Sequence, residues 1–414
     1  MSFSGFILAG WLIDGSGGEI KKHVFLQIKD GHIRQIKTSL KNDIDQSNLL
    51  RRSNLLDLSH CTILPGLVDS HVHLSMSGTD NQQKRKDQLS AGFSDVKDVI
   101  SRHIESHISC GVLAVRDGGD NHAHAFRYKK ECLNPDKTPM CLKVAGRAWH
   151  KAGRYGGLIG RSPHEKETLA GSIAKEKENP DQVNPDQRNP DQVNPDHVKI
   201  VMSGLNSLTE FGKQTPPQFD LEEMKKAVDT AHAGGLRVMV HANGKIPVSI
   251  AVDACCDSIE HGFFMGRENL IKMADKNITW VPTAYTMKAY AEYLKPGSLE
   301  VEISKRNLDH QLKQIFTAKK LGVPIATGTD AGSLGVHHGR SIIEELKLLM
   351  SAGFPIQEAI RCATCNGAEL IGLKKQGLSA GKMPANFITV TGNPEGLPGS
   401  LSSCTIYNKS SLEI

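Results

Sequence analysis

Short apolar runs alternate with amphipathic segments through the middle of the chain. The runs have the length of strands, and segments such as 221–235 and 341–353 repeat apolar residues at helical spacing. The eight runs lie at 62–74, 111–119, 141–146, 197–204, 236–244, 258–263, 278–284 and 323–332. Eight strands, each followed by a crossover, form a closed parallel barrel more readily than an open sheet. The pattern therefore predicts an α/β protein with a (β/α)8 TIM barrel over residues 63–375.

Both ends of the chain carry a β-like pattern instead. Strand-like runs lie at 6–13, 24–29, 32–36, 387–392 and 404–409. Asp30 and Gly31, between the second and third of these runs, are a hairpin signal. We therefore expect a small β-sandwich domain built from both termini, with residues 1–62 as its first part and 376–414 as its second.

A polar repeat interrupts the barrel pattern between Asn179 and His197. The sequence NPDQ recurs there with a period of five residues, ending in NPDH. Proline at every fifth position forbids a helix, while Asn and Asp favour turns. We expect a surface loop that has expanded before the strand at 197–204, and a role in binding a partner stays open.

Composition and charge narrow the class of protein. The chain has 414 residues, of which 39% are hydrophobic and 23% charged, as is typical of a soluble globular protein. Fifty basic residues against 45 acidic ones give a net charge of +5, without a long run of like charges. No apolar run approaches the ~20 residues that span a bilayer. We expect a protein that binds neither nucleic acid nor a membrane.

Cysteine and histidine add two further indications. The nine cysteines form no regular framework, which favours reduced thiols and a cytoplasmic location. Cys362 and Cys365 form a CxxC, but they lie in a stretch with helical character, and a zinc ribbon would need a second pair. Histidine is the commonest metal ligand in proteins, and the chain contains 18. Their positions on the predicted strands decide which of them are candidate ligands.

Chemically capable side chains stand at or near the ends of several predicted barrel strands. His71 and His73 are two residues apart, so both imidazoles project from the same face of their strand. The carboxyl ends of parallel barrel strands converge on one mouth, where catalytic groups collect. The remaining candidates on later strands are Lys199, His241, His261 and Asp330. The sequence thus predicts six polar side chains meeting at one site.

Lys199 differs from the other five candidates because an ammonium group has no lone pair with which to bind a metal. Burial lowers the pKa of a lysine, and the neutral amine can react with CO2. The resulting carbamate has two oxygens that can bridge two metal ions. We expect Lys199 to be carboxylated in this way, since the five other candidates accompany it in strand order.

The order of these residues resembles the amidohydrolase superfamily along nearly the whole chain. The marks are LPGLVDSHVHL at 64–74, followed by Lys199, His241, His261 and Asp330 on the fourth, fifth, sixth and eighth strands. The resemblance implies two divalent metal ions, with zinc expected from the ligand types. His71, His73 and Asp330 would hold one ion, His241 and His261 the second, and carboxylated Lys199 would bridge them. Asp330 would also be the proton shuttle.

Several local strings resemble one branch of that superfamily, the Xaa-Pro dipeptidase and Xaa-Arg carboxypeptidase-like enzymes with their imidazolonepropionase-like relatives. These strings include VRDGGD at 115–120, HANG at 241–244 and TGTDAG at 327–332. The resemblance implies attack of a metal-bridging hydroxide on the amide bond of a small N-acyl amino acid or dipeptide.

The branch resemblance also suggests substrate contacts. His150 would touch the substrate carbonyl or the oxyanion as a catalytic residue, while Arg154 and Tyr155 could bind a substrate carboxylate. Asn243 is a further substrate-binding candidate, and it stands where many members of the branch have His or Tyr. This departure puts the side-chain specificity in doubt.

Other functions remain open at this point. A mononuclear cyclic amidase or deaminase would use the same residues with one metal, and a phosphotriesterase-like or lactonase-like hydrolase would use the same fold. A non-catalytic binding protein would need a broken ligand set, whereas all six candidates are present. The expected partner is a small-molecule substrate, and a homo-oligomer is also compatible with the sequence.

Overall fold

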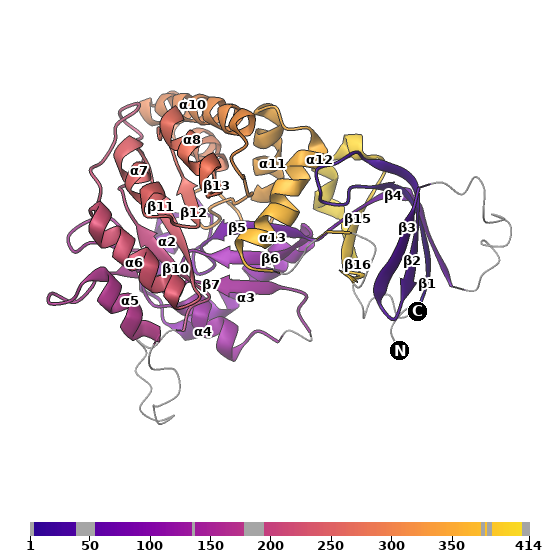
Figure 1. Cartoon of the computed structure of the whole chain (residues 1–414), viewed down its shortest axis with the longest axis horizontal. Coiled ribbons are helices and arrows are strands. Elements are labelled where there is room, and N and C mark those ends of the chain that lie inside the picture. The colour runs from indigo at the N-terminus through magenta and orange to yellow at the C-terminus, as the bar shows by residue number, and fades with distance from the viewer. Residues whose placement is uncertain are drawn as a thin grey trace.

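The structure is a computed structural model of the whole chain (Figure 1). It describes residues 4–38, 54–134, 137–177, 194–373, 377–378 and 383–407. The pentapeptide repeat lies outside the described residues up to position 193, so the expected surface loop stays a prediction. Its last copy is anchored, because the Asp196 carboxylate accepts hydrogen bonds from Lys129 Nζ and from the backbone N–H of Val144.

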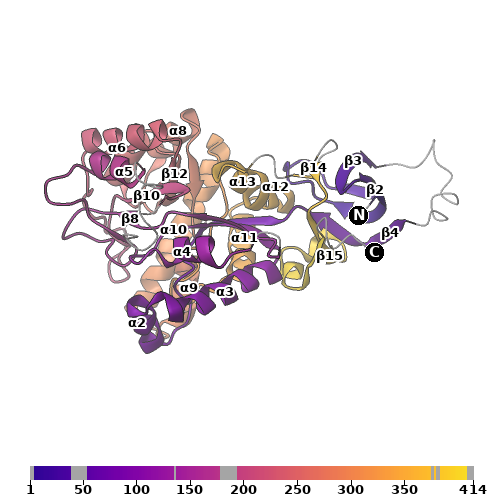
Figure 2. The same ribbon diagram turned by 90° about the horizontal axis from the view of Figure 1, so that it is seen from below.

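The two ends of the chain form one seven-stranded sheet at one end of an elongated molecule (Figure 2). Its order is β14-β3-β2-β1-β4-β15-β16. The strands are β1 Gly5–Leu12, β2 Lys21–Lys29, β3 His32–Lys37, β4 Leu55–Leu64, β14 Met383–Pro384, β15 Phe387–Thr391 and β16 Thr405–Tyr407. The β2–β3 hairpin turns at Asp30 and Gly31, both with positive φ, as a tight hairpin requires. Strands from both termini therefore share one seven-stranded sheet, where the sequence predicts a β-sandwich, and the division at 62/63 and 375/376 stays a prediction.

Strand β4 corrects the expectation of a single strand over 62–74. β4 pairs in parallel with β1 and ends at Leu64, while the next strand begins at Leu67. Pro65 has no backbone N–H to donate, and a Cβ on Gly66 would lie 2.6 Å from Leu113. The chain therefore leaves the terminal sheet and enters the middle of the molecule at this pair of residues.

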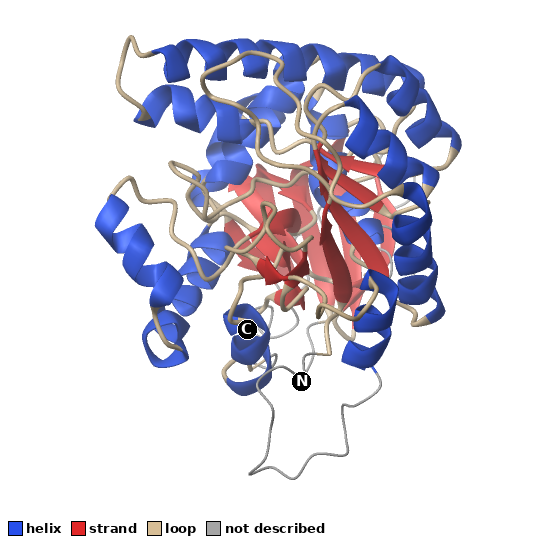
Figure 3. Cartoon of the chain, turned by 90° about the vertical axis from the view of Figure 1, so that its left-hand side faces the viewer, coloured by secondary structure: helices blue, strands red, loops and turns tan. Residues whose placement is uncertain are grey.

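The central strands form two parallel sheets, with helices around the outside (Figure 3). One sheet has the order β5-β6-β7 and the other β13-β12-β11-β10-β8-β9. The strands are β5 Leu67–Val72, β6 Val112–Asp117, β7 Cys141–Val144, β8 Ala148–Trp149, β9 Gly160–Arg161, β10 His197–Val201, β11 Arg237–Ala242, β12 Ser258–His261 and β13 Thr279–Val281. Seven of the eight predicted runs thus contain an observed parallel strand, and the chain is a mixed α/β protein.

The eighth predicted run, 323–332, is not an assigned strand. It joins its neighbours through isolated bridges, from Ile325 to Trp280 and from Ala331 to Val72. Ser70 also donates a backbone hydrogen bond to the carbonyl of Thr327. The strands as assigned therefore do not close into a single sheet.

Helices follow most of the central strands. They are α2 Gln82–Ser90, α3 Phe93–Ser109, α4 His124–Glu131, α5 Leu169–Lys177, α6 Leu221–Ala233, α7 Lys245–Asp253, α8 Arg267–Asp275, α9 Tyr285–Tyr293, α10 Leu299–Leu321, α11 Ser341–Ser351, α12 Ile356–Arg361 and α13 Gly367–Leu370. Short turns are π-helical at Cys362–Asn366 and 3-10 helical at Pro394–Gly396 and Gly399–Ser403. The CxxC is therefore helical, as predicted. No helix in the described ranges is long and apolar enough to cross a membrane.

Candidate active site

A cavity of about 370 Å³ collects nearly all the side chains that the sequence singles out. It lies where β5, β10, β11 and β12 reach their carboxyl ends. The sequence-predicted residues that line it are His71, His73, Tyr155, Lys199, His241, Asn243, His261 and Asp330. All six predicted metal ligands therefore face one space, although they are spread over 260 positions of the chain.

Strand geometry explains how the histidines meet. His71 lies on β5 and His73 directly follows that strand, while Val72 between them is buried in the main apolar core. His241 lies on β11, and His261 is the last residue of the adjacent strand β12. The His241 and His261 rings are 4.6 Å apart between centroids, and those of His71 and His261 are 4.9 Å apart. The adjacent strands β11 and β12 thus bring His241 and His261 together, and β5 of the other sheet brings His71 against His261.

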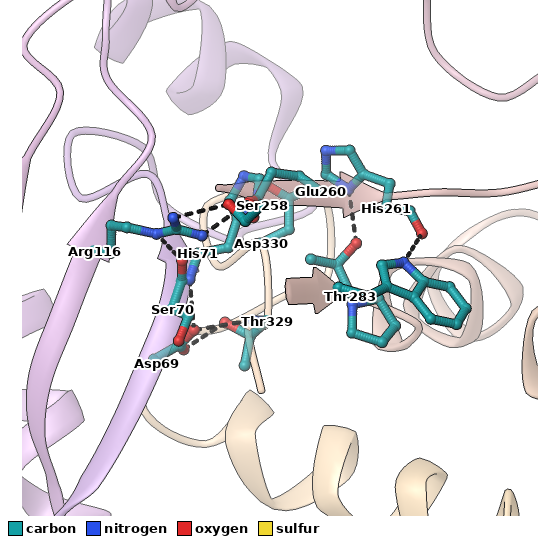
Figure 4. Close-up of polar contacts among 12 residues, drawn as sticks. Asp69, Ser70, His71, Arg116, Ser258, Glu260, His261, Thr283, Thr329 and Asp330 are labelled. Carbon is teal, nitrogen blue, oxygen red and sulfur yellow. Dashed lines mark hydrogen bonds and ion pairs between the residues drawn. The ribbon is translucent and has the colours of Figure 1, made fainter. Parts of the chain in front are cut away.

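A buried chain of polar contacts orients His71 (Figure 4). His71 Nδ1 donates to Glu260 Oε2 at 2.8 Å, and Arg116 holds the other Glu260 oxygen at 2.8 Å. Arg116 also donates to the carbonyl of Ser70. Because Nδ1 carries the proton, the Nε2 of His71 keeps its lone pair. That atom is buried and makes no hydrogen bond with a described residue.

The other three imidazoles are fixed in the same manner. His73 Nδ1 donates to the carbonyl of Gly119 at 2.9 Å, and His261 Nδ1 is hydrogen-bonded to Thr283 Oγ1 at 2.7 Å. His241 instead uses Nε2, which donates to the carbonyl of Gly204 at 3.2 Å and leaves Nδ1 with the lone pair. Burial lowers the pKa of His73 to about 4 and that of His241 to about 3. These rings are neutral, as a metal-binding imidazole must be.

Asp330 approaches the first two histidines from the other side. It has a φ of 59°, so the chain turns sharply where the eighth run ends. Its Oδ2 accepts from Ser333 Oγ, and its Oδ1 lies 3.5 Å from Nε2 of both His71 and His73. Within the part of the chain that is described, His71, His73 and Asp330 are the one group of His, Cys, Asp or Glu residues whose ligand atoms all lie within 4.8 Å. Imidazole and carboxylate together suit a divalent transition metal.

Lys199 lies on β10 with 1% of its surface exposed. Its Nζ is buried and has no hydrogen-bond partner among the described residues. Burial lowers the pKa of Lys199 to about 8, which favours the neutral amine. The partnerless atoms of Lys199 and His71 fit a site completed by a metal, since such atoms are otherwise costly to bury.

The predicted substrate contacts divide into two pairs. Tyr155 and Asn243 line the cavity, with the Tyr155 ring 5.5 Å from that of His241. Asn243 Oδ1 accepts the backbone N–H of Phe263, which commits part of its amide to the local loop. His150 and Arg154 are not lining residues: His150 Nδ1 donates to the carbonyl of Lys151, and exposed Arg154 donates to that of Pro216. Their roles stay predictions without support from the cavity.

Among the cavity residues that the sequence did not single out are an arginine and a tyrosine. Arg85 on α2 and Tyr290 on α9 both line the cavity. Arg85 belongs to the run QQKRKDQ, in which charged residues follow one another without an apolar period. The orienting residues Glu260 and Arg116 were also missed, although Glu260 directly precedes the predicted ligand His261 and Arg116 lies within VRDGGD. Neighbours of a predicted ligand are the signal that could have found these two.

Comparisons with known proteins identify the family of this chain. Residues 62–409 match the model of the amidohydrolase family. An uncharacterized protein of Mycobacterium tuberculosis is 25% identical over 342 residues, covering 82% of this chain and 81% of that protein. Ochratoxinase of Aspergillus niger is 30% identical over 157 residues, which are 37% of this chain and 32% of the enzyme. A solved structure of a Xaa-Pro dipeptidase with bound methionine superposes with a TM-score of 0.77 at 25% identity, covering 98% of both chains. The chain belongs to the amidohydrolase family and is a hydrolase of carbon–nitrogen bonds.

Proposed function

We propose that the chain is a binuclear metal-dependent hydrolase that cleaves the amide bond of a small N-acyl amino acid or dipeptide. The observation that carries the proposal is the convergence of four histidines, Lys199 and Asp330 on one cavity. The likeness to a Xaa-Pro dipeptidase along 98% of both chains supports a peptide-like substrate. A cavity of about 370 Å³ is suited to a small molecule rather than to a polymer.

The ligand assignment follows from the donor atoms. His71, His73 and Asp330 would hold one ion, and His241 and His261 would hold the second. Lys199, carboxylated by CO2, would bridge the pair, which its partnerless Nζ supports. Zinc is the metal that this combination of imidazole and carboxylate favours. When bound, such ions polarise the scissile carbonyl and acidify water.

Asp330 is the residue that we assign to proton transfer. Ser333 holds its Oδ2, so Oδ1 is the atom that faces the two histidines. Burial raises the pKa of Asp330 to about 6, which leaves the carboxylate ionised at neutral pH yet able to hold a proton briefly. Asp330 Oδ1 takes a proton from the attacking water and passes it to the nitrogen of the leaving amine.

The proposal also covers the architecture of the central part of the chain. We infer that the central strands, together with segment 323–332, form a (β/α)8 barrel over residues 63–375, joined to a β domain from 1–62 and 376–414. The isolated bridges from Ile325 and Ala331 to strands on either side support this closure. The site would then lie at the carboxyl ends of the barrel strands, where catalytic groups collect in this architecture.

A mononuclear cyclic amidase or deaminase is the second candidate. One observation favours it. Among the described residues, a single group of three side chains, His71, His73 and Asp330, has its ligand atoms close enough together to hold a metal ion. In that enzyme Lys199 would remain an unmodified amine.

Metal stoichiometry and substrate range test the two candidates together. Purified protein is loaded with zinc in bicarbonate buffer, its metal is counted by mass spectrometry, and it is assayed on dipeptides, N-acyl amino acids, cyclic amides, lactones and phosphotriesters. We expect close to two ions per chain and turnover of linear amides. One ion per chain with turnover of cyclic substrates would establish the second candidate. Fully loaded protein without turnover on the panel would refute both.

A further inference from the structure

The active-site cavity contains a cationic group that neither the metal site nor the proton shuttle employs. Three basic residues line the cavity among those described: Arg85, Lys86 and Lys199. Lys199 belongs to the proposed metal centre, and Lys86 is exposed. Arg85 on α2 is half-buried, so it is less exposed than Lys86 and more exposed than Lys199. It is therefore the guanidinium that a bound substrate would meet inside the cavity.

Backbone carbonyls hold one edge of Arg85 and leave the other available. Its NH1 nitrogen donates to the carbonyl of Ser77 at 2.7 Å and to that of Gly332 at 3.0 Å. Its Nε and NH2 nitrogens make no hydrogen bond with a described residue. The Nε–NH2 edge of a guanidinium is one of the two that match both oxygens of a carboxylate. Arg85 is thus fixed in place with an unused bidentate edge.

The anchoring carbonyl places Arg85 near the reacting groups. Gly332 is two residues beyond Asp330, and Ser333 next to it bonds to the Asp330 carboxylate. Burial lowers the pKa of Arg85, and the negative charge of Asp330 opposes that shift. A ligand on Arg85 would therefore lie beside the proton shuttle without displacing it.

Apolar side chains complete the description of the cavity. Leu158 and Leu205 line it and are 53% and 57% exposed, which is high for leucine. Exposed apolar residues at the edge of a cavity are typical of surfaces that a ligand covers. A ligand that contacts both these leucines and Arg85 would combine an apolar group with an anion.

We propose that Arg85 is the specificity residue that binds the carboxylate of the substrate, and that Leu158 and Leu205 contact its apolar group. The substrate class is then amides whose amine portion carries a carboxylate, with an apolar group attached. This inference rests on the proposed function, and it assigns to Arg85 the role that the sequence suggested for Arg154.

Binding of a matched pair of ligands tests the proposal without turnover. Zinc-loaded protein is titrated calorimetrically with 3-phenylpropionate and with the uncharged 3-phenylpropanamide. We expect wild-type protein to bind the carboxylate about tenfold or more tightly than the amide, as a charge-assisted bidentate pair implies. R85M should lose that preference, R85K should keep part of it, and K84M should retain it. Lys84 is an exposed neighbour on the same helix that does not line the cavity.

The outcomes separate this inference from the proposed function. A carboxylate preference that persists in R85M, or that is missing from wild-type protein, overturns the role of Arg85 even if amides are hydrolysed. A preference that disappears in R85M but not in K84M supports Arg85 even if no amide is turned over.

Loss of the anchoring contacts to Ser77 and Gly332 is the alternative explanation for a defect in R85M. Metal content and thermal unfolding of each variant are therefore measured alongside. If R85M retains both and still binds the amide like wild type, the carboxylate contact is supported. If the amide is lost equally, Arg85 positions the loops and the proposal is wrong.

Discussion

Two cavities lined by described residues differ in chemistry, and the larger of the two lies away from the four active-site histidines. It measures about 700 Å³ and is lined near the amino ends of β11 and β13, by Arg237 and Thr279 among others. Both of its lysines have partners: Lys319 pairs with Glu358 at 2.8 Å, and Lys276 donates to the carbonyl of Val252. The smaller cavity instead contains the partnerless Nζ of Lys199. Unsatisfied buried atoms, and not volume, distinguish the site.

Lysine substitutions in the two cavities should give the largest contrast. Lys199→Ala removes the proposed bridge, and we expect kcat/KM to fall by about 10³-fold or more because both ions lose a ligand. Added acetate or propionate should restore part of the activity by replacing the carbamate. Lys276→Ala in the larger cavity should leave kcat/KM within about twofold. Steady-state assays measure kcat/KM of both variants. Full activity of Lys199→Ala without added acid would show that Lys199 does not bridge the metal ions.

Asp330→Asn should have the next largest effect. The amide cannot take the proton from water, so we expect kcat to fall by about 10² to 10⁴-fold. Part of the metal should remain, since the two histidine ligands that lie within 3.5 Å are untouched. Metal analysis together with kcat measures both effects. An unchanged kcat would show that another group moves the proton.

Glu260→Gln tests how far the orientation of His71 matters. The neutral amide weakens the contact with His71 Nδ1, and we expect metal affinity to fall by about 10 to 100-fold. Glu358→Gln is the matched change in the larger cavity, where a partly exposed ion pair contributes about 1 kcal/mol or less. Metal titration and thermal unfolding compare the two variants. Equal metal affinity in both would contradict the orienting role of Glu260.

The pH dependence of Lys199 carboxylation should be a smaller effect in the same cavity. Its pKa is lowered to about 8, so the neutral amine that reacts with CO2 persists to lower pH than in an ordinary lysine and is lost as pH falls through 8. At constant dissolved CO2, the neutral fraction rises from about 3% at pH 6.5 to about 75% at pH 8.5. Carbon-13 NMR of metal-free protein should show carbamate growing accordingly. A signal that is independent of pH, or present in Lys199→Met, would exclude this assignment.

The parts of the site that could be predicted from sequence are those set by strand periodicity. The spacing of His71 and His73, and the position of Lys199 on a buried run, sufficed because parallel strands end at one mouth. Side chains alternate between the two faces of a strand, so only one of the adjacent residues Glu260 and His261 would be expected to point into the interior. His261 has a φ of 67°, and this turn at the strand end lets both reach His71.

Residues placed by tertiary contacts were not predictable in this way. Arg85 is one of several charged residues on α2, and its contacts with the carbonyls of Ser77 and Gly332, which fix its guanidinium, join segments far apart in the sequence. In the fold, β4 was missed because its pairing with β1 shifts register between Ala9 and Trp11, which interrupts the alternation. The eighth run is not a strand in the structure, because the N–H groups of Thr327 and Thr329 donate to the carbonyl of Cys362 and to Asp69 Oδ1 and not to a neighbouring strand.

In the terminal sheet, strands that pair with each other are synthesised at very different times. Strand β4 lies between β1 and β15, and Thr62 donates to the carbonyl of Gly392, 330 positions later. At a translation rate of about 5 to 20 residues per second, the edge of β4 waits roughly 15 to 65 s for its second neighbour. During that interval it is an open strand edge, which is a template for pairing with other chains. The strand that covers this edge of β4 is therefore synthesised long after β4 itself.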